Sequence, residues 1–154
     1  MFVHSLEWTR LPRGSVNRPH SREFRYDAAG AEMSSLVQHF AQNPTNLGSL
    51  PTVSARGKVG EPGQGHFMIV ELMGSPSRID AAAFQTYSCP NAIACGQFIT
   101  SWIVGRPATD IDRMTADDLM KVLGGLPLGK EYCATLAVNA LQQAIIGLTD
   151  MTEQ

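Results

Sequence analysis

Strand-type apolar runs come first along the chain and helical spacing of apolar residues comes later, and this order limits the folds that the chain can adopt. Residues 66–73 form a compact apolar run rich in strand-forming residues, and residues 78–87 form a second run after a turn at 74–77. This pattern is typical of an antiparallel β-hairpin. Helical spacing of apolar residues follows the hairpin, over residues 90–105, 115–124 and 130–148. Strands grouped ahead of helices favour an α+β fold.

We expect a small antiparallel sheet of about three strands with helices packed on one face. A third strand is expected within residues 51–60, and an earlier helix, with apolar residues from Met33 to Phe40, ends at Asn43 and Pro44. The last helix has the most regular apolar stripe, which consists of Cys133, Leu136, Ala137, Ala140, Leu141, Ala144, Ile145 and Leu148. A chain of 154 residues with 44% hydrophobic residues suits one globular domain, which we place at residues 28–150.

Residues 1–27 lack sustained periodicity and carry an excess of positive charge. Residues 10–25 contain five arginines and one acidic residue, Glu23, whereas the whole chain has a net charge of −2. We predict a flexible basic arm at residues 1–27, with contact to an acidic partner or a targeting role as alternatives. The overall charge indicates no nucleic-acid partner, and the lack of any run of 18 apolar residues indicates no membrane span.

The three cysteines, Cys89, Cys95 and Cys133, do not form a disulfide framework, because their number is odd and their spacing is irregular. They indicate a reducing compartment, and we expect a cytoplasmic protein. Cys95 lies on an apolar helical stripe with Ile99 and Trp102, which is typical of a core residue. Cys89 lies between an expected strand and an expected helix, and Cys133 lies in the first turn of the last helix.

Cys89 and Cys133 are therefore both expected at helix N-termini, where the partial positive charge lowers the pKa of a thiol. A thiolate binds soft metals and attacks sulfur. His66, which follows Gln64 and Gly65 just before a strand, is a further candidate. No CxxC or HxxxH motif is present, so spacing alone does not identify a zinc site, and buried structural thiols remain an alternative.

Three segments occur in a fixed order: HFAQNPTNLGSL at 39–50, FQTYSCPNAIA at 84–94 and LPLGKEYCATLA at 126–137. They resemble the segments HFxNPRNVGxL, FKTYGCGSAIA and LPxxKxHCSxLA of the iron–sulfur cluster assembly scaffolds of the NifU N-terminal or IscU type. The resemblance spans about residues 34–147. It implies a sheet and helices that present three cysteines, with an Asp and a His nearby, at one exposed end. In that family the site assembles a [2Fe–2S] cluster from iron and donated sulfur, and it can also hold zinc.

The resemblance also implies a ligand set. Matched by position, Cys89 and Cys133 correspond to two of the family's cysteines, and the third falls on Gln64. The family's Asp falls on His66, and the His before its last cysteine falls on Tyr132. The implied metal ligands are therefore His66, Cys89 and Cys133, with Gln64 as a further candidate.

These departures affect which cargo the site suits. A [2Fe–2S] cluster normally takes four strong ligands, and this chain supplies two thiolates and one imidazole. Gln64 is a poor iron ligand, and a tyrosine phenol such as that of Tyr132 normally stays protonated near neutral pH. A second subunit in a homodimer, or a small thiol, could complete the ligands of a shared cluster. Zinc accepts a Cys₂His set with one further ligand, so the expected cofactor is a [2Fe–2S] cluster or zinc.

The resemblance further implies a scaffold rather than an enzyme, with a cysteine desulfurase and an Hsp70-type chaperone as partners. The family's chaperone-recognition segment is kept at Leu126, Pro127 and Lys130 and departs at Leu128 and Gly129. Two alternatives are a persulfide sulfur acceptor at Cys89 or Cys133, and a degenerate adaptor of the same fold without a metal site. The sequence has no P-loop, GxSxG or dinucleotide-binding motif, which argues against hydrolase and nucleotide-binding activities.

Overall fold

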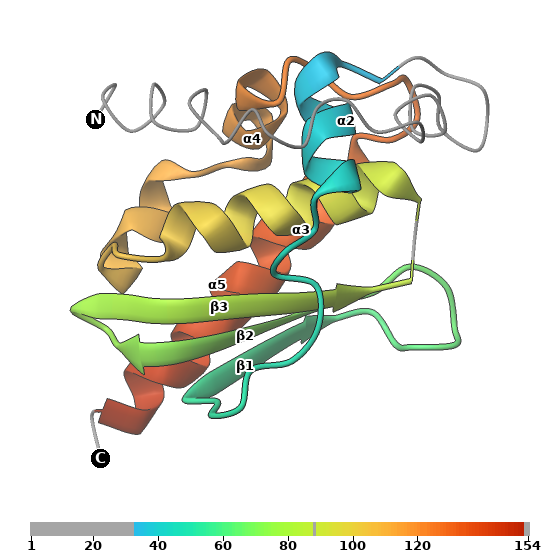
Figure 1. Ribbon diagram of the computed structural model, residues 1–154. Helices are drawn as coiled ribbons and strands as arrows, with labels where there is room; N and C mark the ends of the chain where they lie inside the picture. Colours follow the sequence, from blue (N-terminus) through green and yellow to red (C-terminus); the bar gives the residue numbers. More distant parts are fainter. Residues whose placement is uncertain (1–32, 88, 153–154) are drawn as a thin grey trace.

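The computed structural model describes residues 33–87 and 89–152, so the predicted arm at residues 1–27 lies outside the described residues. Three strands form one antiparallel sheet in the order β1-β2-β3 (Figure 1). The predicted α+β class and the three-stranded antiparallel sheet are confirmed. The elements are α2 (Ser35–Gln42), β1 (Ala55–Val59), β2 (Met68–Ser75), β3 (Arg78–Thr86), α3 (Pro90–Ile103), the 3₁₀ helix η2 (Ala108–Arg113), α4 (Ala116–Val122) and α5 (Tyr132–Thr152).

The helices cover one face of the sheet, as predicted. Helix α5 packs on β1 and β2, and α3 packs on β3, with both helices on the same side of the strands in Figure 1. A Cβ atom at Gly57 would overlap the backbone of Ala140 and Ala144, so α5 lies in direct backbone contact with β1. The residues of the sheet that are buried on this face include Ala55, Met68, Val70, Leu72, Ile79, Ala82 and Phe84.

The hairpin turn is tighter than the predicted turn at 74–77. Strand β2 continues to Ser75, which pairs with Arg78, so Pro76 and Ser77 alone connect the two strands. The register shifts between Met73 and Gly74, where Gly74 has a φ of 136°. Only glycine adopts this conformation without strain, which explains why a glycine stands at this register shift near the end of β2.

Residues 43–54, which we call the strap, run along the edge of β3 and then cross the outer face of the sheet. The amide of Phe84 donates to the carbonyl of Asn46 at 2.9 Å, and the amide of Gly48 donates to the carbonyl of Phe84 at 2.8 Å. The amide of Leu50 then donates to the carboxylate of Glu71 at 2.9 Å. These bonds satisfy part of an exposed sheet edge, and they could not be predicted from hydrophobic periodicity because they use backbone groups.

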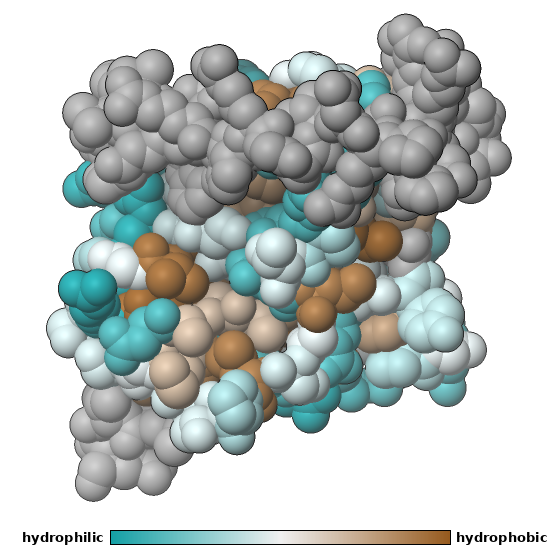
Figure 2. Space-filling model, viewed as in Figure 1, coloured by the Kyte–Doolittle hydropathy of each residue, from teal (hydrophilic) through white to brown (hydrophobic). Residues whose placement is uncertain are grey.

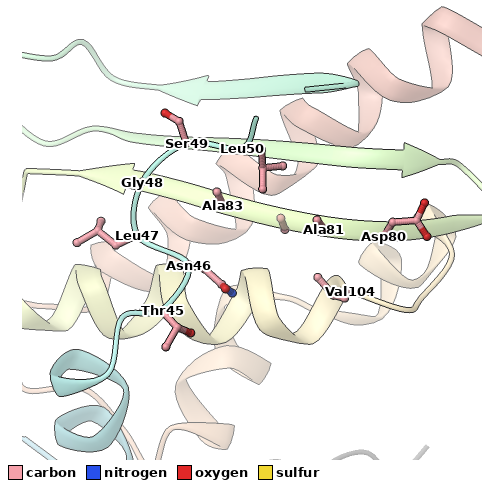
Figure 3. Close-up of a pocket in the computed structure, with 11 residues that line it drawn as sticks. Thr45, Asn46, Leu47, Gly48, Ser49, Leu50, Asp80, Ala81, Ala83 and Val104 are labelled. Atoms are coloured by element: carbon pink, nitrogen blue, oxygen red, sulfur yellow. The ribbon is translucent and has the colours of Figure 1, made fainter. Parts of the chain in front are cut away.

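Asn46 anchors the strap to α3. Its amide donates to Oε1 of Gln97 at 2.8 Å, and its side chain donates to the hydroxyls of Thr100 and Ser101 at 3.0 Å each. Figure 3 shows the Asn46 side chain pointing toward this helix. Gln97 and Thr100 are buried, so the network fixes the strap to the core through satisfied polar groups.

A cavity of about 360 Å³ lies between the strap and the outer part of β3. Its walls include Leu47 of the strap, Asp80 and Ala83 of β3, and Val104 at the end of α3 (Figure 3). Figure 2, in the view of Figure 1, shows apolar residues over the middle of this face with hydrophilic residues beside them. The cysteines are not among the residues that line this cavity.

The remaining helix boundaries follow local signals. Thr115 and Asp118 form the predicted capping box at the start of α4. The last helix begins at Tyr132 and ends at Thr152, slightly later than the predicted range of 130–148, and η2 was not predicted from the sequence. Over residues 33–87 and 89–152, no helix combines the length and the hydropathy that crossing a bilayer requires.

Candidate metal or cluster site

The predicted site residues come from separate elements that meet at one end of the sheet. The loop between β1 and β2, the end of β3 and the start of α3 lie at the same end of the molecule, on the right of Figure 1. Cys89 is the N-cap residue of α3, with an extended backbone, and Pro90 begins the helix. Cys133 is the second residue of α5.

The fold brings the two predicted cysteine ligands together. The Sγ atoms of Cys89 and Cys133 lie 4.0 Å apart. Cys89 is partly exposed, whereas Cys133 and Cys95 are both 0% exposed. Cys95 belongs to the core, as predicted from its place on an apolar stripe.

The two neighbouring sulfurs differ in their affinity for protons. The Cys133 thiol, as a donor, lowers the pKa of Cys89 to about 4, with help from the backbone N–H groups of Ala92 and Asn91 and against the effect of burial. The Cys89 sulfur and burial raise the pKa of Cys133 well above its usual range, and burial raises the pKa of Cys95. Near neutral pH the pair therefore holds one thiolate and one thiol.

Asn91 lies beside Cys89, a position that the sequence analysis did not predict. Its side chain is fully buried, and Nδ2 lies 3.7 Å from Sγ of Cys89. Its Oδ1 has no hydrogen-bond partner among the described residues. An amide side chain in the first helical turn, two residues after a candidate ligand, is the signal that could have identified it, because such groups orient and stabilise a ligand.

His66 and Gln64 are exposed in the loop that precedes β2. The ring centroid of His66 lies 4.4 Å from that of Tyr132, which directly precedes Cys133. The structure thus places the imidazole beside a sequence neighbour of one sulfur. Among residues 33–87 and 89–152, no three His, Cys, Asp or Glu side chains form a group that could hold a metal ion. A ligand set that joins His66 or Gln64 to the sulfurs therefore stays a prediction.

The sulfur pair alone limits the chemistry of the site. Zinc–sulfur bonds are about 2.3 Å long, so two sulfurs bound to one ion are at most about 4.6 Å apart. The observed distance of 4.0 Å lies within that limit. The same pair also offers a partly exposed thiolate for attack on a sulfur atom, with a second thiol beside it. Both metal binding and sulfur transfer therefore suit this arrangement.

Comparison with known proteins agrees with the predicted family. The model of the NifU-like N terminal domain matches residues 32–153. The chain is 36% identical over 111 residues to the iron-sulfur cluster assembly scaffold protein IscU 1 of Archaeoglobus fulgidus. The aligned segment covers 72% of each chain. It is 32% identical over 112 residues to the iron-sulfur cluster assembly scaffold protein IscU of Aquifex aeolicus, and the aligned segment covers 71% of each chain.

Solved structures show the same fold. A NifU-like N-terminal protein from Brucella abortus superposes with a TM-score of 0.60 and 16% identity, over 76% of this chain and 94% of that one. A scaffold protein described as putative for the SUF system, from Fervidobacterium Islandicum, has a TM-score of 0.56 and 16% identity, over 73% and 95% of the two chains. Because the family model spans most of the chain and the IscU relatives exceed 30% identity, this protein belongs to the family of NifU-like N-terminal domains.

Proposed function

We propose that this protein is a scaffold on which an iron–sulfur cluster is assembled, with Cys89 and Cys133 as thiolate ligands. The observation that carries the proposal is the 4.0 Å separation of their sulfurs at one end of the sheet. Relatives at 32–36% identity are named as iron–sulfur cluster assembly scaffold proteins, in agreement with the prediction that the chain is not an enzyme. Iron–sulfur clusters are held mainly by cysteine thiolates, which are the groups that this pair supplies.

The remaining ligands have to come from near this pair. His66 is exposed and lies against Tyr132, next in sequence to Cys133, and as a ligand it would have to turn toward the sulfurs. Gln64 lies in the same loop. Two thiolates and one imidazole suit zinc better than a complete [2Fe–2S] cluster, so a cluster would need a further ligand from a second copy of the chain or from a small thiol.

The partners follow from the same role. A cysteine desulfurase would deliver sulfur to the partly exposed Cys89, and an Hsp70-type chaperone would bind the segment from Leu126 to Lys130. Leu128 in this segment is 93% exposed, whereas Pro127 beside it is buried. An apolar side chain fully in water is well placed for capture by another protein.

The test is anaerobic reconstitution of the purified chain with ferrous iron, cysteine and a desulfurase, followed by iron and sulfide analysis and an absorption spectrum. Zinc is measured in the protein as purified. Wild type and the Cys95→Ala control should hold metal, and the Cys89→Ala, Cys133→Ala double variant should not. Stoichiometric metal in the double variant would overturn the proposal. Metal-free wild type under all conditions would favour the adaptor that lacks a site.

A second function, sulfur acceptance, is favoured by the exposure of Cys89 and by its pKa of about 4. The Cys89 thiolate would attack the outer sulfur of a desulfurase persulfide. The S–S bond then breaks, and the desulfurase cysteine leaves as a thiolate. Mass spectrometry after incubation with a desulfurase and cysteine should show one added sulfur atom on Cys89 in wild type. An unmodified Cys89 peptide would exclude this step.

A further inference from the structure

We propose that Cys89 and Cys133 are a site of reversible disulfide formation, and that oxidation there removes both thiolates from cargo binding. The effect on cargo rests on the proposed function, whereas the formation of the bond does not. The Sγ atoms lie 4.0 Å apart, and a disulfide bond is about 2.0 Å long. The sulfurs must therefore approach by about 2 Å, which is the scale of small side-chain rotations.

The surroundings of the two sulfurs favour this pairing over others. The Nδ2 of Asn91 lies 3.7 Å from Sγ of Cys89, a distance at which a hydrogen bond does not hold the sulfur tightly. Cys133 is 0% exposed and packs in the core, so the partly exposed Cys89 is its route to an external oxidant. Cys95 is also 0% exposed, which makes it an internal control for a buried thiol in the same core.

Exposure sets the order of the two chemical steps. Cys89 first attacks one sulfur of a small disulfide such as glutathione disulfide. The S–S bond of the oxidant breaks, and one glutathione leaves as a thiolate. Cys89 then carries a mixed disulfide with the second glutathione.

The second step closes the protein disulfide. Cys133 gives up its proton to the departed thiolate and attacks Sγ of Cys89, and the second glutathione leaves. Two electrons pass from the protein sulfurs to the oxidant, and two molecules of glutathione thiol are formed once the last thiolate takes up a proton. A dithiol reductant reverses the exchange.

The experiment uses the full chain, freed of metal with a chelator and incubated with glutathione disulfide near neutral pH. Free thiols are then blocked with iodoacetamide, and the digest is analysed by mass spectrometry without reduction. Wild type should give a cross-linked peptide pair that contains Cys89 and Cys133, with Cys95 alkylated only after denaturation. The Cys133→Ala variant should instead accumulate glutathione on Cys89, and Cys95→Ala should behave like wild type.

A mixed disulfide that persists on Cys89 in wild type, free thiols throughout, or cross-links between two chains would overturn the proposal. Zinc binding is measured on the same samples and should be lost on oxidation and restored by dithiothreitol. If the cross-link forms while zinc binding persists, the ligand assignment of the proposed function fails and the disulfide site stands. If zinc binds through the pair but no cross-link forms, the disulfide site alone fails.

Discussion

Sγ of Cys89 lies 4.0 Å from Sγ of Cys133, although 44 positions of sequence separate the two residues. One sulfur stands at the start of α3 and the other in the first turn of α5, and these two helices pack against each other. The pair therefore exists only when the helices are packed on the sheet. No local motif holds it, which explains why spacing alone could not identify the site.

The rate of Cys89 alkylation should be nearly constant from pH about 5 upward and should fall as the pH drops through about 4, because the thiolate is the reactive form and its pKa is about 4. Removal of the Cys133 donor in Cys133→Ala should raise the pKa toward that of an ordinary thiol and move the fall to higher pH. Labelling with iodoacetamide, followed by peptide mass spectrometry, measures both profiles. A wild-type rate that climbs about tenfold per pH unit up to pH about 8 would contradict the cause given for the shift.

Gly57→Ala should destabilise the fold by about 1–3 kcal/mol or more, because the new Cβ overlaps the backbone of Ala140 and Ala144. Urea unfolding measures the change. Gly147→Ala is the matched control, since its Cβ would meet Cβ of Ala55 at an ordinary 3.8 Å. That variant should gain up to about 1 kcal/mol from helix propensity. Equal effects of the two variants would show that α5 does not touch β1 as described.

Gln97→Leu should cost about 1–3 kcal/mol of unfolding free energy, because it removes a buried side chain and leaves the partly buried amide of Asn46 without its acceptor. The side chain of Thr45 also loses its donor. Gln85→Ala removes an exposed bond to Ser49 and should change stability by no more than about 0.5 kcal/mol. Denaturant midpoints of the two variants, compared with wild type, decide whether the buried network anchors the strap.

Tyr132→His should tighten zinc binding by about tenfold or more, because it adds a strong nitrogen ligand beside Cys133 and next to His66. Competition with a colorimetric chelator measures the affinity. Tyr132→Phe keeps the ring against His66 and should stay within about threefold of wild type. An unchanged affinity in the His variant would place residue 132 out of reach of the ion.

The spacing of apolar residues along the sequence was sufficient to predict much of the fold. The alternating and continuous apolar runs predicted the β2–β3 hairpin, and the 3.6-residue stripes predicted α3, α4 and α5. The apolar stripe also placed Cys95 in the core. These features depend on which residues are buried, and burial is what periodicity reports.

The features that periodicity missed depend on polar or long-range contacts. The strap is held by backbone amides and by Asn46, and its residues have no regular apolar spacing. The position of Asn91 near Cys89 follows from the helix start, and the 4.0 Å sulfur distance follows from the packing of two helices. Such contacts are specified by three-dimensional packing rather than by a local pattern.

The close backbone contact at Gly57 is a point around which a change in the tilt of α5 would move the start of the helix, where Cys133 lies. The helix touches β1 at Ala140, seven residues beyond Cys133, which corresponds to an arm of about 10 Å along the helix axis. A tilt of about 10° around this pivot swings the sulfur of Cys133 by nearly 2 Å, or about half its present distance from the sulfur of Cys89. The packing of α5 on the sheet and the separation of the two sulfurs are therefore coupled.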